Sequence, residues 1–329
     1  MLWHSVGGIG RVAEVLQPRR VCINERKFST SKWEYVMNDM IREDLLALTT
    51  NKTSWNRRDF VASSIAAGFA LAVQPVCAQT MLITDTSGLD AGDVQIPTDK
   101  GSIPGYCAKP YKVITNSPTI LVVQEIFGVH EHIKDVCRRF AKRGYMAVAP
   151  SLYHRQGDVT QMKEAKEILT SVVSKVPDEQ VMRDLDATLV WASNNGGDNV
   201  KVGITGFCWG GRITWLYTAH NPRVKAAVAW YGPLMREKNA MNPYHPIDVV
   251  KNINVPVLGL YGGADAGIPN DTVAKMNAAL KAAAKPASIH LYPDTPHAFH
   301  ADYRPTYRFD QALDGWSRCL NHFRANGVA

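Results

Sequence analysis

Residues 201–211 read KVGITGFCWGG, an apolar run that ends in the motif GFCWG at 206–210 and leads into an amphipathic stretch. This is the strand–turn–helix pattern G-x-S-x-G of nucleophile elbows, with Cys208 in place of the serine. Such a turn is strained, and Gly206 and Gly210 remove side chains that would collide with the adjoining elements. The pattern predicts a cysteine nucleophile at the N-terminus of a helix, where the helix dipole favours a thiolate.

Two other interpretations of this turn remain open from the residues alone. The spacing Gly206-x-Cys208-x-x-Gly211 differs at one position from the G-x-G-x-x-G dinucleotide fingerprint. A cysteine at the middle position would block the close approach of a pyrophosphate, so we consider a dinucleotide site the weaker hypothesis. Cys208 could also be an ordinary buried cysteine, because free cysteines are common in protein cores.

Short apolar runs alternate with longer amphipathic runs along residues 79–329, without an internal repeat or linker, so we interpret this part as one domain. The apolar runs follow an antiparallel pair at Val94–Pro97 and Ser102–Ala108, and they predict strands at Thr119–Gln124, Met146–Ala149, Val202–Thr205, Ala226–Trp230, Val255–Tyr261 and Ser288–Tyr292. The amphipathic runs predict helices at His132–Arg143, Met162–Val173, Asp178–Asn194, Arg212–His220, Asp271–Ala284 and Tyr307–Arg324. This alternation is typical of an α/β fold with a mostly parallel sheet flanked by helices on both faces.

A carboxylate and a histidine follow the last two predicted strands. Asp265 lies on a Gly-rich loop after one strand, and His297 lies on a short loop after the next. The chain order Cys208, Asp265, His297 is nucleophile, acid, base, as in α/β-hydrolases. His300 is the competing base, and two further carboxylates, Asp294 and Asp302, compete with Asp265.

Glu125 lies at the end of the first long predicted strand, in the segment QEIFG at 124–128. In an α/β-hydrolase this loop supplies an oxyanion donor, so a glutamate here would face the thiol of Cys208. A nearby carboxylate disfavours a thiolate through like-charge repulsion, or it accepts the thiol proton. In either case we expect Glu125 to control the protonation of Cys208.

Taken together, five segments resemble the dienelactone hydrolase (carboxymethylenebutenolidase) family from about Val94 to the C-terminus. They are QEIFG at 124–128, APSLY at 149–153, GFCWGG at 206–211, YGGAD at 261–265 and PHAF at 296–299. The resemblance implies an α/β-hydrolase fold and gives roles to matching residues. It implies Cys208 as nucleophile, His297 as base, Asp265 as its orienting acid, Glu125 as the residue gating the thiol, and the main-chain amides of Ile126 and Trp209 as an oxyanion hole.

The implied reaction is hydrolysis of a small-molecule ester or lactone through a thioester acyl-enzyme. Family members that act on dienelactone carry an arginine shortly after the base, where this chain has Ala301. Arg304 and Arg155 are the candidate substrate-binding arginines.

The competing hypothesis is a non-catalytic small-molecule-binding protein on the same fold. A third hypothesis, thioesterase or peptidase activity, uses the same residues.

Composition limits the other classes of function. The chain has 329 residues, of which 46% are apolar, 20% charged and 9% aromatic, as in ordinary globular proteins. Its net charge is +7, but the basic residues are scattered among acidic ones, so we expect no nucleic-acid partner. No spacing of His, Cys or Glu predicts a metal site, and no cofactor is expected. Cys107, Cys137 and Cys319 are expected to remain reduced along with Cys208.

The N-terminal part predicts export. Residues 56–78 contain Arg57-Arg58, an uncharged run of small and apolar residues, and the small-residue end Val76-Cys77-Ala78. This pattern predicts a twin-arginine signal peptide, recognised by the twin-arginine export machinery, and a periplasmic protein. The run is too short for a stable membrane span. Residues 1–55 form an extension of doubtful status, and Met37 or Met40 would give a leader of more usual length.

Overall fold

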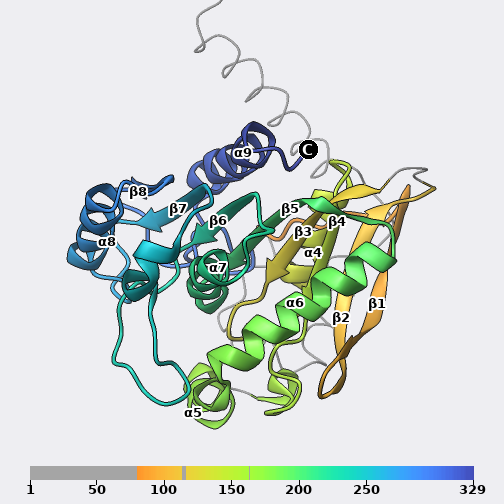
Figure 1. Cartoon of the computed structure of the whole chain (residues 1–329), viewed down its shortest axis with the longest axis horizontal. Coiled ribbons are helices and arrows are strands. Elements are labelled where there is room, and N and C mark those ends of the chain that lie inside the picture. Colours follow the sequence, from red (N-terminus) through yellow and green to blue (C-terminus); the bar gives the residue numbers. More distant parts are fainter. Residues whose placement is uncertain (1–79, 113–115, 163) are drawn as a thin grey trace, which may run out of the picture.

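The computed structural model describes residues 80–112, 116–162 and 164–329. In this part of the chain, eight strands form one sheet in the order β1-β2-β4-β3-β5-β6-β7-β8 (Figure 1). Their bounds are β1 Leu89–Thr98, β2 Gly101–Pro110, β3 Ser117–Val123, β4 Met146–Pro150, β5 Gly197–Phe207, β6 Ala226–Trp230, β7 Val257–Gly262 and β8 Ala287–Tyr292. β1 pairs antiparallel with β2 and β2 with β4, whereas every other pair is parallel. The predicted α/β architecture is confirmed.

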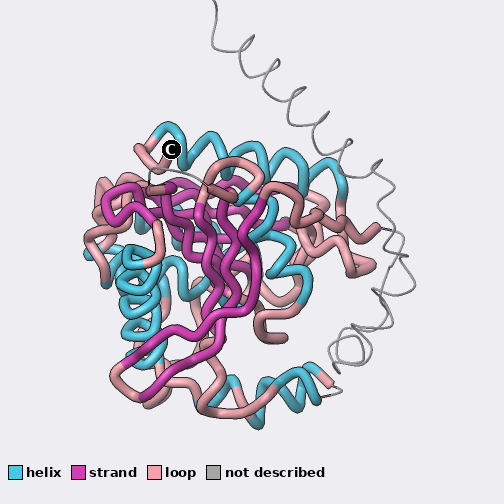
Figure 2. Tube along the Cα trace, turned by 90° about the vertical axis from the view of Figure 1, so that its right-hand side faces the viewer, coloured by secondary structure: helices cyan, strands magenta, loops and turns pink. Residues whose placement is uncertain are grey.

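Helices lie on both sides of the strands (Figure 2). They are α4 Glu131–Ala141, α5 Ala165–Ser171, α6 Asp178–Asn194, α7 Trp209–His220, α8 Asn270–Ala282 and α9 Phe309–Ala325. α4 and α9 pack together, with the rings of Phe140 and Trp316 4.6 Å apart between centroids. α6 and α7 also pair, because the Tyr217 hydroxyl donates to Asp186 at 2.9 Å. β4 and β6 consist entirely of buried residues, as expected for strands enclosed between two layers.

Two segments differ from the sequence prediction. The helix expected at Met162–Val173 is only Ala165–Ser171, between short 3₁₀ helices at Val159–Gln161 (η1) and Val173–Lys175 (η2). Asp158 caps the first 3₁₀ turn by accepting from the Thr160 amide at 2.9 Å, so a tighter helix begins there instead. A third 3₁₀ helix, η3, at Pro246–Asn252, was not predicted, and proline at its first turn suits such a start.

The register places the ends of neighbouring strands at one edge. Val123 of β3 lies opposite Gly206 of β5, and Gly262 of β7 lies opposite Tyr292 of β8. The loops that follow these strands therefore leave the sheet at the same edge, which is where open α/β sheets bind their ligands. This arrangement brings together loops that are far apart in the sequence.

The described chain begins with an arm that binds the body. The Thr80 hydroxyl donates to the Asp302 carbonyl, and the Leu82 amide lies 3.4 Å from the Asp302 carboxylate. The Thr84 amide donates to Asp135 of α4 at 2.6 Å. The extension at 1–55 and the expected signal peptide at 56–78 lie outside the described residues. Within the described residues, no helix has the length and apolar character to cross a membrane.

Candidate active site

Cys208 is the residue between β5 and α7, and its backbone is strained. Its φ is 54° and its ψ is −115°, which is unusual for a residue that is not glycine. The Cys208 amide donates to the Trp230 carbonyl at 3.0 Å, which ties the turn to β6. A Cβ on Gly206 would overlap the Gly210 carbonyl, and one on Gly210 would overlap the Val123 carbonyl. The two glycines are therefore required by the close approach of β3, β5 and α7.

His297 and Asp265 meet as the sequence predicts. The Nδ1 of His297 lies 2.6 Å from Oδ2 of Asp265. The other oxygen of Asp265 accepts from the amides of Gly267 at 2.8 Å and Ile268 at 3.2 Å. The Asp265 side chain is 1% exposed, whereas that of His297 is 30% exposed. The buried acid is thus fixed by its own loop and orients an imidazole that remains accessible.

The opposite side of the imidazole faces the sulfur. Burial by itself lowers the pKa of His297, but the electrostatic interaction with Cys208 and the hydrogen bonds that the ring donates to Asp265 and Cys208 outweigh this effect. The net result raises the pKa of His297 from 6.5 to about 10. At neutral pH the ring is therefore an imidazolium beside the sulfur, an arrangement typical of cysteine–histidine nucleophiles.

The competing residues lie elsewhere. His300 is 2% exposed and is enclosed by the rings of Phe207 and Trp230, at centroid distances of 5.2 and 4.6 Å. Asp302 binds His132 and Arg139 and makes no contact with His297 among its hydrogen bonds. Asp294 is exposed. In the described chain, Asp265 is the carboxylate that binds His297.

Glu125 is buried at 1% exposure, and its carboxylate has two partners of its own. The Tyr303 hydroxyl donates to Glu125 Oε2 at 2.5 Å, and His130 Nε2 lies 3.4 Å from the same oxygen. Burial raises the pKa of Glu125, but His130 and Tyr303 outweigh burial and lower it to about 2. Glu125 is therefore a buried carboxylate at neutral pH.

No sequence motif indicates the two partners of Glu125. Tyr303 lies six positions after His297, and His130 lies five positions after Glu125, but neither spacing belongs to a motif. The signal that was available is the concentration of histidines at 130 and 132 directly after QEIFG. Within the described residues, no cluster of His, Cys, Asp and Glu is suited to a metal ion.

The two candidate substrate-binding arginines differ in their surroundings. Arg155 makes a two-pronged ion pair with Asp184 of α6 at 2.6 and 3.1 Å and donates to Thr98 of β1 at 2.7 Å. It therefore connects the loop after β4 to α6 and β1. The Arg304 guanidinium lies 5.9 Å from the centroid of the Phe127 ring and has no ion pair with a described carboxylate. Of the two, Arg304 is the one with a guanidinium available for a substrate anion.

The two predicted oxyanion donors also have free amides. No main-chain or side-chain acceptor among the described residues takes a hydrogen bond from the amide of Ile126 or of Trp209. Trp209 is the first residue of α7, where amides have no partner within the helix. Ile126 follows Glu125 after β3, whose end lies beside the elbow.

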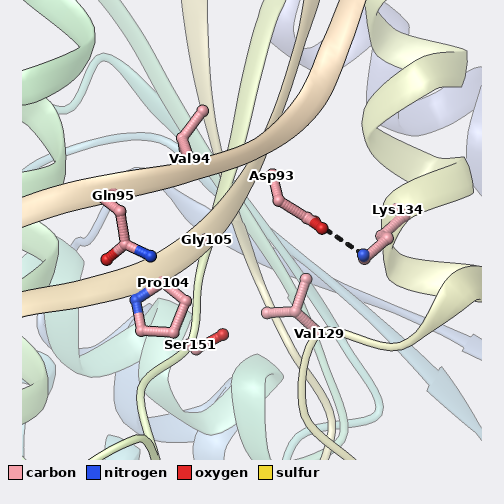
Figure 3. Close-up of a pocket in the computed structure, with 8 residues that line it drawn as sticks. All are labelled: Asp93, Val94, Gln95, Pro104, Gly105, Val129, Lys134 and Ser151. Atoms are coloured by element: carbon pink, nitrogen blue, oxygen red, sulfur yellow. Dashed lines mark hydrogen bonds and ion pairs between the residues drawn. The ribbon is translucent and has the colours of Figure 1, made fainter. Parts of the chain in front are cut away.

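A separate hollow lies beside the β1–β2 hairpin. It encloses about 400 Å³ between the β1–β2 hairpin and the start of α4, and its wall includes Val129 and Ser151. Figure 3 shows Asp93 and Lys134 pointing toward each other across it, 2.7 Å apart. None of Cys208, Asp265 and His297 lines this hollow, so it is not the place of the chemistry.

The four cysteines of the described chain are free thiols, and their environments differ. Burial raises the pKa of Cys107 to about 12 and raises the pKa values of Cys137 and Cys319 well above the ordinary thiol value. Cys208 is the partly exposed member of the set. Because thiolates are the reactive form, the three buried thiols are expected to be inert.

Comparison with known proteins gives a consistent result. A model described as the dienelactone hydrolase family matches residues 103–327. A protein of Methylorubrum extorquens named "Putative carboxymethylenebutenolidase" is 58% identical over 287 residues, covering 87% of this chain and 98% of that protein. A protein of Yersinia pestis with the same name is 53% identical over 244 residues, covering 74% of this chain and 91% of that protein. A crystal structure from Klebsiella pneumoniae, described as that of a "Putative Dienelactone Hydrolase", has a TM-score of 0.71 at 53% identity and covers 72% of this chain and 98% of its own.

Proposed function

Because this chain belongs to the dienelactone hydrolase family, we propose that it cleaves an ester or lactone with Cys208 as nucleophile, His297 as proton carrier and Asp265 as its orienting acid. The sheet order and the structural neighbour confirm the α/β-hydrolase fold on which such a triad is built. The observation that carries the proposal is the hydrogen bond between His297 and the buried Asp265, made by a ring that also interacts electrostatically with Cys208.

The proposed reaction has two halves. The Cys208 thiolate attacks the carbonyl carbon, an S–C bond forms, and the carbonyl oxygen becomes an oxyanion held by the amides of Ile126 and Trp209. The C–O bond to the leaving group breaks as His297 gives its proton to that oxygen, which leaves a thioester. His297 then takes a proton from water, the new hydroxide attacks the thioester, and the C–S bond breaks to restore the thiolate. Thiolate is a good leaving group, so this site suits activated esters and lactones better than amides.

A thiol-labelling experiment separates the enzyme from a non-catalytic binding protein on the same fold. We expect iodoacetamide to modify Cys208 before Cys107, Cys137 and Cys319, because Cys208 is the partly exposed thiol beside an imidazolium. An aryl ester in excess should slow this labelling while it is being hydrolysed. Labelling that begins at a buried thiol, or that an ester fails to slow, would favour the binding protein. A panel of lactones, thioesters and amides then distinguishes the class of acyl substrate.

Arg304 is the proposed site for a substrate carboxylate, and Arg304→Gln tests this role. The substitution removes the charge, and we expect kcat/KM for a carboxylate-bearing lactone to fall about 10- to 100-fold, the usual value of a charged hydrogen bond. The same ratio for a neutral aryl ester should change less than about twofold. Arg308→Gln is the matched control, since Arg308 is exposed and its guanidinium binds main-chain carbonyls of its own turn. Equal losses for both substrates would contradict the assignment.

We also propose that residues 56–78 direct the protein to the periplasm through the twin-arginine machinery. The proposal rests on Arg57-Arg58, the uncharged run after them, and the small residues before Gln79. Peptide mass mapping of the periplasmic fraction tests it, with Gln79 expected as the first residue. Intact peptides that span Ala78 and Gln79 would contradict cleavage, and peptides from residues 1–36 would contradict a start at Met37 or Met40.

A further inference from the structure

Glu125 has an asymmetric environment. Its Oε2 atom accepts a hydrogen bond from the Tyr303 hydroxyl at 2.5 Å, and His130 Nε2 lies 3.4 Å from the same atom. Its Oε1 atom is fully buried and has no hydrogen-bond partner among the described residues. A buried carboxylate oxygen without a donor is costly, so its position requires an explanation. Tyr303 and His130 thus hold Oε2, whereas Oε1 has no hydrogen-bond donor in the described part of the chain.

The strand register shows which loop lies beside the loop of Glu125. Val123 and Gly206 are directly opposite each other on β3 and β5, and Glu125 and Cys208 each lie two residues further on. The first turn of α7 approaches this same loop so closely that Gly210 must lack a side chain, because a Cβ would overlap the carbonyls of Val123 and Gln124. Glu125 and the sulfur therefore belong to adjoining loops at one edge of the sheet.

We propose that Tyr303 and His130 are positioning residues, which hold Glu125 as a carboxylate beside Cys208 and so determine how readily the thiol ionises. This inference rests on the proposed role of Cys208 as the nucleophile. Tyr303 and His130 do not touch the reacting atoms; they act through Glu125. The charge that they maintain on Glu125 opposes a negative charge on the sulfur. The pair thereby opposes ionisation of the thiol.

The turn that carries Tyr303 is itself rigidly held. Asp302, its neighbour, is buried and binds Arg139 at 2.6 Å and His132 at 3.1 Å. Arg139 also binds Asp135 at 2.6 Å, so the turn is attached to α4 by charged hydrogen bonds. These bonds therefore hold the turn in the position from which the Tyr303 hydroxyl reaches Glu125.

Ionisation states agree with this geometry. Burial lowers the pKa of His130, which is thus neutral at pH 7 and able to donate a single N–H toward the carboxylate. The two donors outweigh the burial of Glu125 and lower its pKa to about 2. Four other titratable groups are close enough to interact with the charge of Glu125: Tyr153 after β4, Tyr231 after β6, His132 on α4 and His300 before the turn of Tyr303.

Tyr303→Phe removes one donor and keeps the ring. Burial then works against a less well solvated carboxylate, so the pKa of Glu125 rises. The protonated fraction of Glu125 at pH 4.5 therefore increases in the variant, whereas the carboxylate remains ionised at pH 8. Repulsion of the thiolate is therefore relieved at the acidic pH alone. The rate of Cys208 alkylation at pH 4.5, divided by the rate at pH 8, should rise about three- to tenfold.

The test is this alkylation ratio, measured with iodoacetamide on the full chain and followed by mass of the Cys208 peptide. Glu125→Gln removes the charge at every pH and should speed alkylation at both pH values, and Tyr303→Phe should add nothing to the ratio in the Glu125→Gln background. Tyr217→Phe is the matched control, because Tyr217 is also buried and donates to a carboxylate, Asp186, away from the site. Its ratio should equal that of the unmodified protein.

A second pair of variants tests the other donor and does not depend on Tyr303→Phe being folded. His130→Leu removes the N–H and should raise the ratio, whereas His130→Gln keeps an N–H donor and should raise it less. An unchanged ratio in Tyr303→Phe or His130→Leu would overturn the inference, as would an equal rise in the Glu125→Gln background. If Cys208 of the unmodified protein is slow to label and esters are not hydrolysed, the proposed function fails instead.

Discussion

Cys208→Ala is expected to lower kcat/KM for an activated aryl ester by about 10⁴-fold or more, the usual result of removing a covalent nucleophile. The variant keeps the elbow, because alanine replaces only the sulfur and the two flanking glycines remain. The ester still binds and the amides of Ile126 and Trp209 still face its carbonyl, so a small residual rate is expected. Hydrolysis is measured by release of the aryl alcohol.

Cys107→Ala is the matched control for this substitution. Cys107 lies in β2 as a buried thiol, so its loss should leave kcat/KM within about twofold while lowering stability slightly. Melting followed by circular dichroism checks that both variants are folded. If Cys208→Ala retained more than a tenth of the activity, a different residue would have to be the nucleophile.

Asp265→Asn is expected to lower kcat by about 10³- to 10⁴-fold with little change in shape. The carboxylate accepts from His297 at 2.6 Å, and it contributes to the rise in the pKa of that ring to about 10. An amide carries no charge to stabilise the imidazolium, and it can present an N–H to the ring and so favour the wrong tautomer. The pKa of His297 should therefore fall, and iodoacetamide should modify Cys208 more slowly at pH 6.

Asp294→Asn provides the comparison, because Asp294 lies in the same loop as His297 but is exposed. Its kcat and its alkylation rate should match those of the unmodified protein. A loss of activity in Asp294→Asn comparable to that in Asp265→Asn would mean that the loop, and not the orienting carboxylate, is responsible.

The parts of the fold that could be predicted depend on local patterns. β3 and β6 are buried along almost their whole length, and an uninterrupted apolar run identifies such a strand. The elbow was predictable because a tight strand–turn–helix connection leaves no room for side chains at two fixed positions. The structure shows this close packing at Gly206 and Gly210, where a Cβ would overlap main-chain atoms. The shortened helix at Ala165–Ser171 was not predictable from periodicity, since a cap at Asp158 decides where the preceding 3₁₀ turn begins.

The site was predictable to the extent that each residue follows its own strand. Asp265 and His297 occupy loops after β7 and β8, and register alone brings them together. Choosing between Asp265 and Asp302 required the structure, because Asp302 is much nearer to His297 in sequence, and the fold shows that it binds His132 instead. The hydrogen bond between Tyr303 and Glu125 joins residues 178 positions apart, and no local pattern encodes a contact of that kind.

The central claim is that the acyl group passes through a thioester on Cys208. Mass spectrometry of protein quenched with acid during turnover of an aryl ester tests it most directly. The account predicts one acyl mass on the peptide containing Cys208, absent from Cys208→Ala and discharged by hydroxylamine. An unmodified Cys208 peptide during steady turnover, or an acyl group on another residue, would contradict it.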